Sequence, residues 1–464
     1  MSKNLKILLV VALALTVAAP AMAAKFAFHG DMDNRFNLYT NQIGWFGGDS
    51  GSQVLDDDGR NDTFGEIKYR LWTEMATDDG SIKGVYGIEV GGVKFGQSGG
   101  GSFSGDGVNL ETRWAYTDFQ LPGVDSKARF QIGLFTNTVN KWFWSETAMG
   151  VKFYTDNWYL AWLRGGQNFT GSGEDWGDGD IDSLNARYDL KVEPVKVGFF
   201  LSYLWSKTSD DFADYAGFNP FAKAPGWEVK VLPAGDWNIL ALGIDGGWST
   251  ATNFGKAFIN WDGIYEFGSL DNFSEDGGVT TEDIDQKGYL LHADLGLNFG
   301  KATVTYTVLY ASGHDLSSSS NDIDAFISVD VDANYSIIFN EGVYTNDTYF
   351  SERPYVGISG MFLNKLALDY AATKKTKLGI AGLYLMTAED LEWTDGASDF
   401  SESALGIEID AYVTHKLYDN LELALNFGYL VSGDAMDFFE TSATQDGSAD
   451  VNIWTSTAHV RYSF

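Results

Sequence analysis

The chain has 464 residues with 64 acidic and 31 basic side chains, and its formal net charge of −33 argues against binding to nucleic acid. Aromatic residues make up 15% of the chain, which excludes the acidic disordered class, and glycine (53) far outnumbers proline (7), as in proteins with many strands and turns. Because the chain has no cysteine, disulfides, thiolate metal sites and covalently attached haem are excluded.

The first 23 residues have the pattern of an export signal. Lys3 and Lys6 form a short basic region, and the apolar run 7–19 after them is too short for a membrane helix. Residues 21–23 (Ala-Met-Ala) then supply the small side chains that a signal peptidase requires. We expect residues 1–23 to be a signal peptide that is cleaved after Ala23, and residues 24–464 to form one domain.

Apolar and polar residues alternate with a period of two through the rest of the chain, which predicts strands with one apolar and one polar face. In segment 25–39, Phe28 and Phe36 lie on one face, and Asp33 and Arg35 lie on the other. No segment after the signal has the roughly 18 continuous apolar residues of a membrane helix, so only strands could cross a membrane. The same alternation recurs in 63–77, 287–298, 403–415 and 421–431.

Short and long connections alternate between the predicted strands, and this rhythm is typical of outer-membrane barrels. We place the short turns near 78–80, 122–126, 155–157, 191–195, 249–255, 299–301, 373–376 and 416–420. We place the long loops near 41–62, 92–107, 135–148, 165–181, 207–236, 268–286, 311–365, 389–402 and 432–449. Eight turns and nine loops predict 18 strands with both termini at the turn end, and 16 strands is the alternative. The long loop 311–365 has room for one more hairpin.

The final strand carries the most specific resemblance. Segment 454–464 ends in Phe464, with Tyr462 and Val460 on the same face and His459 and Arg461 on the opposite face. It resembles the terminal strand of outer-membrane proteins, and this resemblance implies that Phe464 belongs to the signal read by the barrel assembly machinery.

Across residues 24–464 the sequence resembles large outer-membrane porins of proteobacteria, including the 18-stranded substrate-specific and alginate-export-like barrels. The resemblance implies an all-β fold, a transmembrane antiparallel up-and-down β-barrel in the cell outer membrane. It also implies a homotrimer that contacts lipid and lipopolysaccharide and passes small polar solutes or ions. No substrate motif is matched.

The two-faced strands point independently to a water-filled channel. In hydrocarbon every backbone N–H and C=O must be paired internally, so the sheet has to close on itself. A barrel of 16–18 strands encloses a lumen wide enough for water. The inward faces are too charged to fill that space as a dry core, because a buried unpaired charge costs several kcal/mol. We therefore expect passive diffusion of small polar solutes.

The charged residues on the polar faces of the strands, which we expect to point into the lumen, have two interpretations. A basic ladder could set a transverse field that orients solutes, or its arginines could neutralise the nearby acids Asp31, Glu66, Glu111 and Asp189. Both interpretations can hold together. The ladder consists of Arg35, Arg70, Arg113, Arg129, Arg187 and Arg461, and the acids that we expect to line the pore are Asp31, Asp33, Glu66, Glu111, Glu408 and Asp410.

The third loop, at about 135–148, resembles the inward-folded constriction loop of porins. Its alternative is an outer loop with Trp142 and Trp144 in the interfacial aromatic belt. The residues that we expect to narrow the pore are Asn137, Asn140, Lys141, Trp142, Trp144 and Glu146.

Other functions have weaker support in the sequence. Ser98 lies in a G-x-S-x-G match, but within a glycine-rich loop rather than a strand-to-helix elbow. An outer-membrane hydrolase is therefore only the second alternative, and no enzyme is expected. Acidic stretches 56–58 and 174–180 and the pair Asp434 and Asp437 lack full calcium-loop spacing, so we expect no cofactor and only weak divalent-cation binding. The main alternative is a structural or binding barrel: an adhesin, a receptor or a sheath for a secreted electron-transfer protein.

Overall fold

The structure is a computed structural model that describes residues 25–42, 60–96, 110–123, 127–166, 180–206, 237–273, 282–315, 322–329, 331, 333, 335–339, 359–394, 397–440, 445–449 and 451–464. These residues form one antiparallel sheet in which every strand pairs with its neighbours in the chain. The strands are β1 (Lys25–Gln42), β2 (Arg60–Ala76), β3 (Ile82–Lys94), β4 (Glu111–Gln120), β5 (Arg129–Asn140), β6 (Trp144–Tyr154), β7 (Trp158–Gly166), β8 (Ile181–Val192), β9 (Val195–Ser206), β10 (Trp237–Thr252), β11 (Gly255–Phe273), β12 (Glu282–Phe299), β13 (Ala302–Ala311), β14 (Met361–Ala371), β15 (Thr376–Thr394), β16 (Asp399–Tyr418), β17 (Leu421–Ser432) and β18 (Ile453–Ser463).

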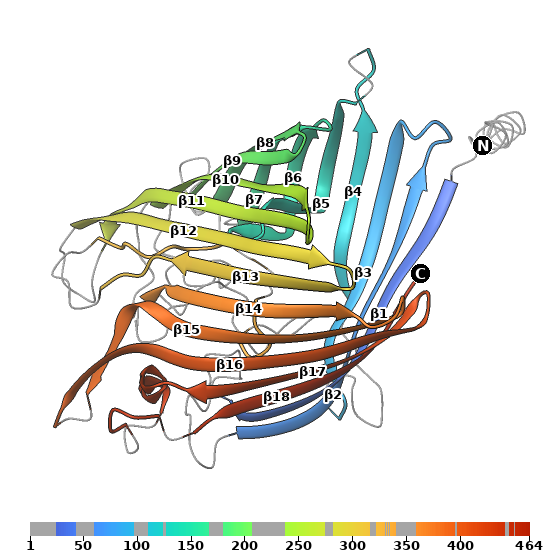
Figure 1. Cartoon of the computed structure of the whole chain (residues 1–464). Coiled ribbons are helices and arrows are strands. Elements are labelled where there is room, and N and C mark those ends of the chain that lie inside the picture. Colours follow the sequence, from blue (N-terminus) through green and yellow to red (C-terminus); the bar gives the residue numbers. More distant parts are fainter. Residues whose placement is uncertain are drawn as a thin grey trace, which may run out of the picture.

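The sheet closes into a barrel because β1 also pairs with β18. At the seam, Gly30 and Phe464 exchange two main-chain hydrogen bonds, each 3.0 Å long. On the inner face, Arg461 is ion-paired with Asp31. The first strand begins and the last strand ends at the same end of the barrel (Figure 1). The prediction of an 18-stranded up-and-down barrel is therefore confirmed.

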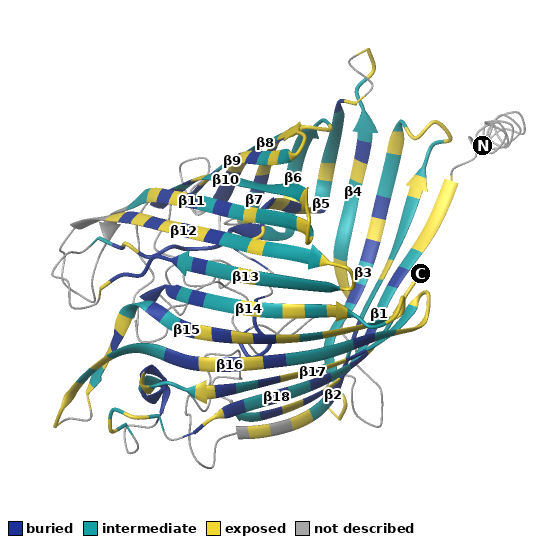
Figure 2. Ribbon diagram, viewed as in Figure 1, coloured by how far each residue is buried: buried dark blue, intermediate teal, exposed yellow. Residues whose placement is uncertain are grey.

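Burial alternates along the strands, as the hydropathy pattern predicts (Figure 2). Large apolar side chains point outward, and Phe28 and Leu366 are 69% and 58% exposed. Charged side chains point inward, and Arg35 and Glu66 are 2% and 1% exposed. An outer surface of this kind would be costly in water and is stable against hydrocarbon. No helix in the described part of the chain is long and apolar enough to cross a membrane.

Three connections are shorter than expected. The third of the expected long loops, between β5 and β6, is only 141–143 rather than 135–148, because the two strands continue until a short turn joins them. Similarly, the loop expected at 268–286 is only 274–281, and the loop expected at 389–402 is only 395–398. Crossing a bilayer takes about 9–11 residues, whereas β15 and β16 have 19 and 20. Beyond the bilayer the strands remain paired but lose their apolar face, so hydropathy alone ends them too early.

The connection between β13 and β14 folds into the lumen, which the sequence did not predict. Its central described part, 322–339 without 330, 332 and 334, is called here the inserted segment. Phe326 and Ile338 are 1% and 0% exposed, and they belong to one cluster with inner-wall residues such as Leu309. Within the described residues of 312–360 there is no strand, only a single bridge between Ile323 and Gln286. This part of the lumen is therefore filled by an apolar cluster rather than by water alone, because a loop supplies its own apolar side chains.

Candidate functional site

The tip of the β5–β6 hairpin, residues 138–143, lies inside the barrel against the inner wall that β7 to β12 form. The end of β5 approaches β8 and β9, to which it is not paired. Tyr159 on β7 donates its hydroxyl to the Thr138 carbonyl at 2.9 Å, and Arg187 on β8 donates to the Val139 carbonyl at 2.9 Å. The hairpin is therefore bent inward and fixed by side chains of the wall.

Asn140 and Trp142 bind the tip to two carboxylates farther along the wall. The Asn140 amide donates to Asp262 on β11 at 2.7 Å and to Asp245 on β10 at 3.1 Å. The Trp142 indole N–H donates to Asp262 at 3.2 Å. The Asn140 side-chain oxygen also accepts the Trp142 main-chain N–H at 2.8 Å, which keeps the turn compact.

Aromatic and cationic side chains complete this contact. The Trp142 ring lies 4.9 Å from the His292 ring on β12, and His292 in turn lies 2.8 Å from Asp262. The Lys141 ammonium lies over the Trp142 ring at 4.7 Å and 4.0 Å from the Asp262 carboxylate. The tip thus presents one lysine beside a buried acidic and aromatic anchor.

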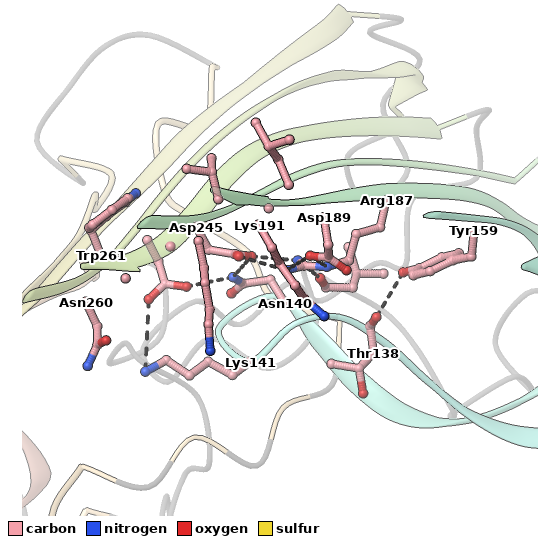
Figure 3. A pocket seen from close by; sticks show the side chains of 18 residues that line it. Thr138, Asn140, Lys141, Tyr159, Arg187, Asp189, Lys191, Asp245, Asn260 and Trp261 are labelled. Carbon is pink, nitrogen blue, oxygen red and sulfur yellow. Dashed lines mark hydrogen bonds and ion pairs between the residues drawn. The ribbon is translucent and has the colours of Figure 1, made fainter. Parts of the chain in front are cut away.

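A cavity of about 670 Å³ lies beside the tip and is bounded by β7 to β11. Its lining includes four basic side chains (Lys141, Arg187, Lys191 and Lys196) and three carboxylates (Asp189, Asp245 and Asp262). Figure 3 shows Arg187 and Asp245 facing each other in this lining, while the Lys141 side chain extends away from this pair toward the Asp262 carboxylate. The cavity therefore combines a small basic excess with amide groups, in a chain whose formal charge is −33.

The six ladder arginines are all engaged by acids of the wall. Arg187 binds Asp245 at 2.6 Å and Asp189 at 2.8 Å, and Arg35 binds Asp33 at 3.2 Å and Glu66 at 3.4 Å. Their other contacts are Arg70 with Glu89, Arg113 with Glu146 at 2.7 Å, Arg129 with Asp118, and Arg461 with Asp31.

Three of the four acids expected to neutralise the arginines do so in the structure: Asp31, Glu66 and Asp189. Glu111 is the exception, because it lies exposed at the start of β4. The neighbouring Arg113 binds Glu146 instead. The geometry is therefore a ladder of ion pairs spread over much of the wall, and the sequence did not single out Asp118, Asp245 or Glu89.

The expected pore-lining acids Glu408 and Asp410 hold the inserted segment. One Glu408 oxygen accepts the main-chain N–H groups of Ile337 and Ile338 at 2.9 and 2.8 Å, and Asp410 accepts that of Ile337 at 3.2 Å. Asp33, in contrast, lies near the seam, 3.3 Å from His459. The acids of the inner wall thus differ in role: Glu408 and Asp410 bind the inserted segment, whereas Asp33 contacts a side chain at the seam.

A carboxylate on β11 holds the inserted segment in the same way. Glu266 on β11 accepts the Ile327 N–H at 2.9 Å and the Gln286 amide at 3.3 Å. The segment also contacts the hairpin tip, since the Val329 N–H donates to the Phe143 carbonyl at 2.8 Å. Buried Tyr335 faces the Trp142 ring at 6.3 Å, and burial raises the pKa of its phenol well above the usual range.

The residues expected in the third loop divide into two groups. Asn140, Lys141 and Trp142 form the tip at the cavity. Asn137, Trp144 and Glu146 lie on the paired parts of β5 and β6, where Asn137 accepts from Lys152 at 3.3 Å and Trp144 is buried. The sequence missed Asp262 and Asp245, although both follow the inward phase that it identified.

Several other expectations lie outside the described residues: the signal peptide, Ser98, the stretch 56–58, and 174–179. Asp434 and Asp437 belong to η5 (Asp434–Phe439), a 3-10 helix between β17 and β18. There Asp437 accepts the Trp393 indole N–H at 3.1 Å. Among the described residues, no group of three or more His, Asp or Glu side chains is arranged to hold a metal ion.

Comparison with known proteins gives a match in fold. No family model and no curated protein matches the sequence. Among solved structures, OccK9 (OpdG) of Pseudomonas aeruginosa matches with a TM-score of 0.52 and 11% identity, over 95% of this chain and 98% of that one. A BenF-like porin from Pseudomonas fluorescens matches with a TM-score of 0.51 and 11% identity, over 95% and 98%. The outer membrane protein OprD of Pseudomonas aeruginosa matches with a TM-score of 0.51 and 8% identity, over 96% and 95%.

Proposed function

We propose that this protein is an outer-membrane porin through which small polar solutes or ions diffuse passively. The carrying observation is a closed 18-stranded barrel with an apolar exterior and ion-paired charges on its inner wall. Such a wall is stable only where water or matched partners reach it. The barrel fold that the chain shares with OprD and a BenF-like porin supports this proposal.

The hairpin tip and the inserted segment narrow the lumen in this proposal. Both lie against the inner wall, and they contact each other through Phe143 and Val329. The cavity beside Lys141 then becomes the narrow passage, in which ammonium, guanidinium and carboxylate groups orient a polar solute. The arginine ion pairs supply the field across the wall.

Location and assembly are part of the same proposal. The signal pattern at 1–23 directs export, with cleavage after Ala23, and the aromatic C-terminal strand ending in Phe464 is read by the barrel assembly machinery. In the outer membrane the exposed apolar band contacts lipid and lipopolysaccharide, and three copies associate through part of it. Acidic loops bind divalent cations weakly.

A liposome-swelling assay tests this function. Folded protein in liposomes should admit a monosaccharide quickly and a tetrasaccharide slowly, because the lumen is narrowed rather than open. Liposomes without protein, and liposomes with heat-unfolded protein, serve as controls. Equal swelling with and without folded protein, for every solute down to glycerol, would contradict the proposal.

The alternative is a binding or structural barrel, which the packing of the inserted segment favours. Its apolar side chains and two sets of buried hydrogen bonds fill part of the lumen with protein. A receptor or sheath barrel would show no solute uptake, and a sheath would also co-purify with an electron-transfer partner in fixed proportion. The swelling assay therefore separates the two functions.

A further inference from the structure

Asp262 holds more of the hairpin tip than any other residue described above. One of its oxygens accepts the Asn140 amide at 2.7 Å, and the other accepts the Trp142 indole N–H at 3.2 Å. The second oxygen also lies 2.8 Å from the His292 ring nitrogen. Its side chain is buried, with 8% exposed, so water cannot replace these partners cheaply.

The side chains of the tip meet at Asp262, although the Asn140 amide also donates to Asp245 at 3.1 Å. The Trp142 indole carries a single N–H, and Asp262 receives it. The Lys141 ammonium lies 4.0 Å from the same carboxylate. Three consecutive residues, from Asn140 to Trp142, therefore converge on one wall carboxylate.

The inserted segment rests on this docked tip. The Val329 N–H donates to the Phe143 carbonyl, and the Tyr335 ring faces the Trp142 ring. Release of the tip would therefore also remove one support of the inserted segment. A single carboxylate on β11 thus lies beneath two chain segments that come from different parts of the sequence.

We propose that Asp262 is the positioning residue of the channel: it fixes the β5–β6 tip inside the lumen against the wall at β11 and so sets the position of the Lys141 ammonium in the passage. This inference deepens the proposed function and rests on it. Asp262 acts through the tip and need not touch a solute. Its loss should leave the barrel closed but let the tip and Lys141 move.

Asp294 provides a matched control. It lies on β12, faces the same lumen, and contacts the other side of His292 at 3.2 Å and Thr307 at 2.6 Å. None of these contacts is with the tip. Asp262→Asn and Asp294→Asn remove the same negative charge from neighbouring strands, so a pure charge effect predicts equal changes in the two variants.

Thiol labelling measures the position of the tip without any need for conduction. The chain has no cysteine, so Phe143→Cys introduces a single thiol at a site that is 1% exposed. With Asp262→Asn, a maleimide should label this thiol at least about tenfold faster than with Asp294→Asn, because charged hydrogen bonds to the tip are lost. Equal labelling rates in the two variants would overturn the inference.

Single-channel currents provide the second readout. Asp262→Asn should make the open current fluctuate between several levels, whereas Asp294→Asn should keep one level, and Asp262→Glu should partly restore it. If Asp262→Asn fails to fold, Asn140→Ala with Trp142→Phe tests the same contact from the tip and should give the same result. No current in the unsubstituted protein, together with the labelling difference, would refute the porin function but leave the positioning role standing.

Discussion

At the scale of single residues, the inner wall is built from matched charges. A lone buried charge is expensive, and removing one partner of a buried ion pair costs about 3–5 kcal/mol. The Arg187 pair with Asp245 follows this rule, since the two side chains are 18% and 17% exposed and bind at 2.6 Å. Arg187 also supports the hairpin tip through the Val139 carbonyl. Arg187 therefore both neutralises a wall carboxylate and helps to hold the hairpin tip that borders the cavity.

We expect Arg187→Gln to lower the free energy of unfolding by about 3 kcal/mol, because Asp245 is left without its cation in a largely buried position. The uncompensated carboxylates should also shift the ion preference of the channel toward cations. Urea unfolding in vesicles measures the first effect, and the reversal potential in a salt gradient measures the second.

Arg164→Gln is the matched control for Arg187→Gln. Arg164 is paired with Asp180 and Asp182 on the wall, but it does not line the cavity. Arg164→Gln should lower the free energy of unfolding but change the ion preference less than Arg187→Gln does. Identical reversal potentials for the two variants would show that Arg187 does not line the path of the ions.

Gly198 makes room for the Arg187–Asp245 pair. A Cβ atom at Gly198 would lie 2.3 Å from Arg187 Nη2 and 2.5 Å from Asp245 Oδ1. Gly198→Ala should therefore push the pair apart and destabilise the barrel by about 1–3 kcal/mol. Gly382→Ala on β15 is the control, since a Cβ there meets nothing within 4 Å. Equal melting temperatures for the two variants would argue against this tight fit.

At the scale of elements, the sequence predicts the strands well. The alternation of apolar and polar residues follows directly from a sheet between lipid and a polar lumen, so strand number and facing could be derived. The ends of the strands could not be derived in this way, because β15 and β16 stay paired beyond the point where their apolar face ends. The hairpin tip shows a similar limit: Trp142 was identified, but its partner Asp262 is 120 residues away.

The inserted segment was missed for a physical reason. Its apolar residues, such as Phe326 and Ile338, show no strand or helix period, and they become a core only against a wall formed by other strands. The carboxylates that hold it, Glu266 and Glu408, lie 61 and 70 residues away from the amides that they accept. A single sequence contains no local signal for such a contact.

We expect Glu266→Leu to loosen the inserted segment, because the Ile327 N–H then loses its acceptor in a buried place. Hydrogen exchange at Ile327 should accelerate by roughly tenfold or more, in line with the cost of an unpaired buried amide. Glu266→Gln keeps an oxygen at the same position and should exchange nearly as slowly as the unsubstituted protein. Equal exchange in the Leu and Gln variants would show that packing alone holds the segment.

At the scale of the whole molecule, the barrel is one closed sheet with a single seam. Gly30 lies at that seam, where a Cβ atom would come within 2.3 Å of the Phe464 ring. Gly30→Ala should therefore push the half-exposed Phe464 ring aside and weaken closure by about 1 kcal/mol, whereas Gly263→Ala, with only ordinary contacts beyond 3.6 Å, should not. In SDS, unheated protein should migrate as a compact form, and Gly30→Ala should lose that form at a lower temperature. The same opening temperature for both variants would contradict this role of the seam.

Current through single molecules in a planar lipid bilayer tests the porin account most directly. Protein that still shows the compact form in SDS should insert and give stepwise, ohmic increments of current, of modest size because the tip and the inserted segment narrow the lumen. Folded protein that inserts in the bilayer and passes no current in any salt would contradict the account, and would leave a barrel closed by its own inserted segment.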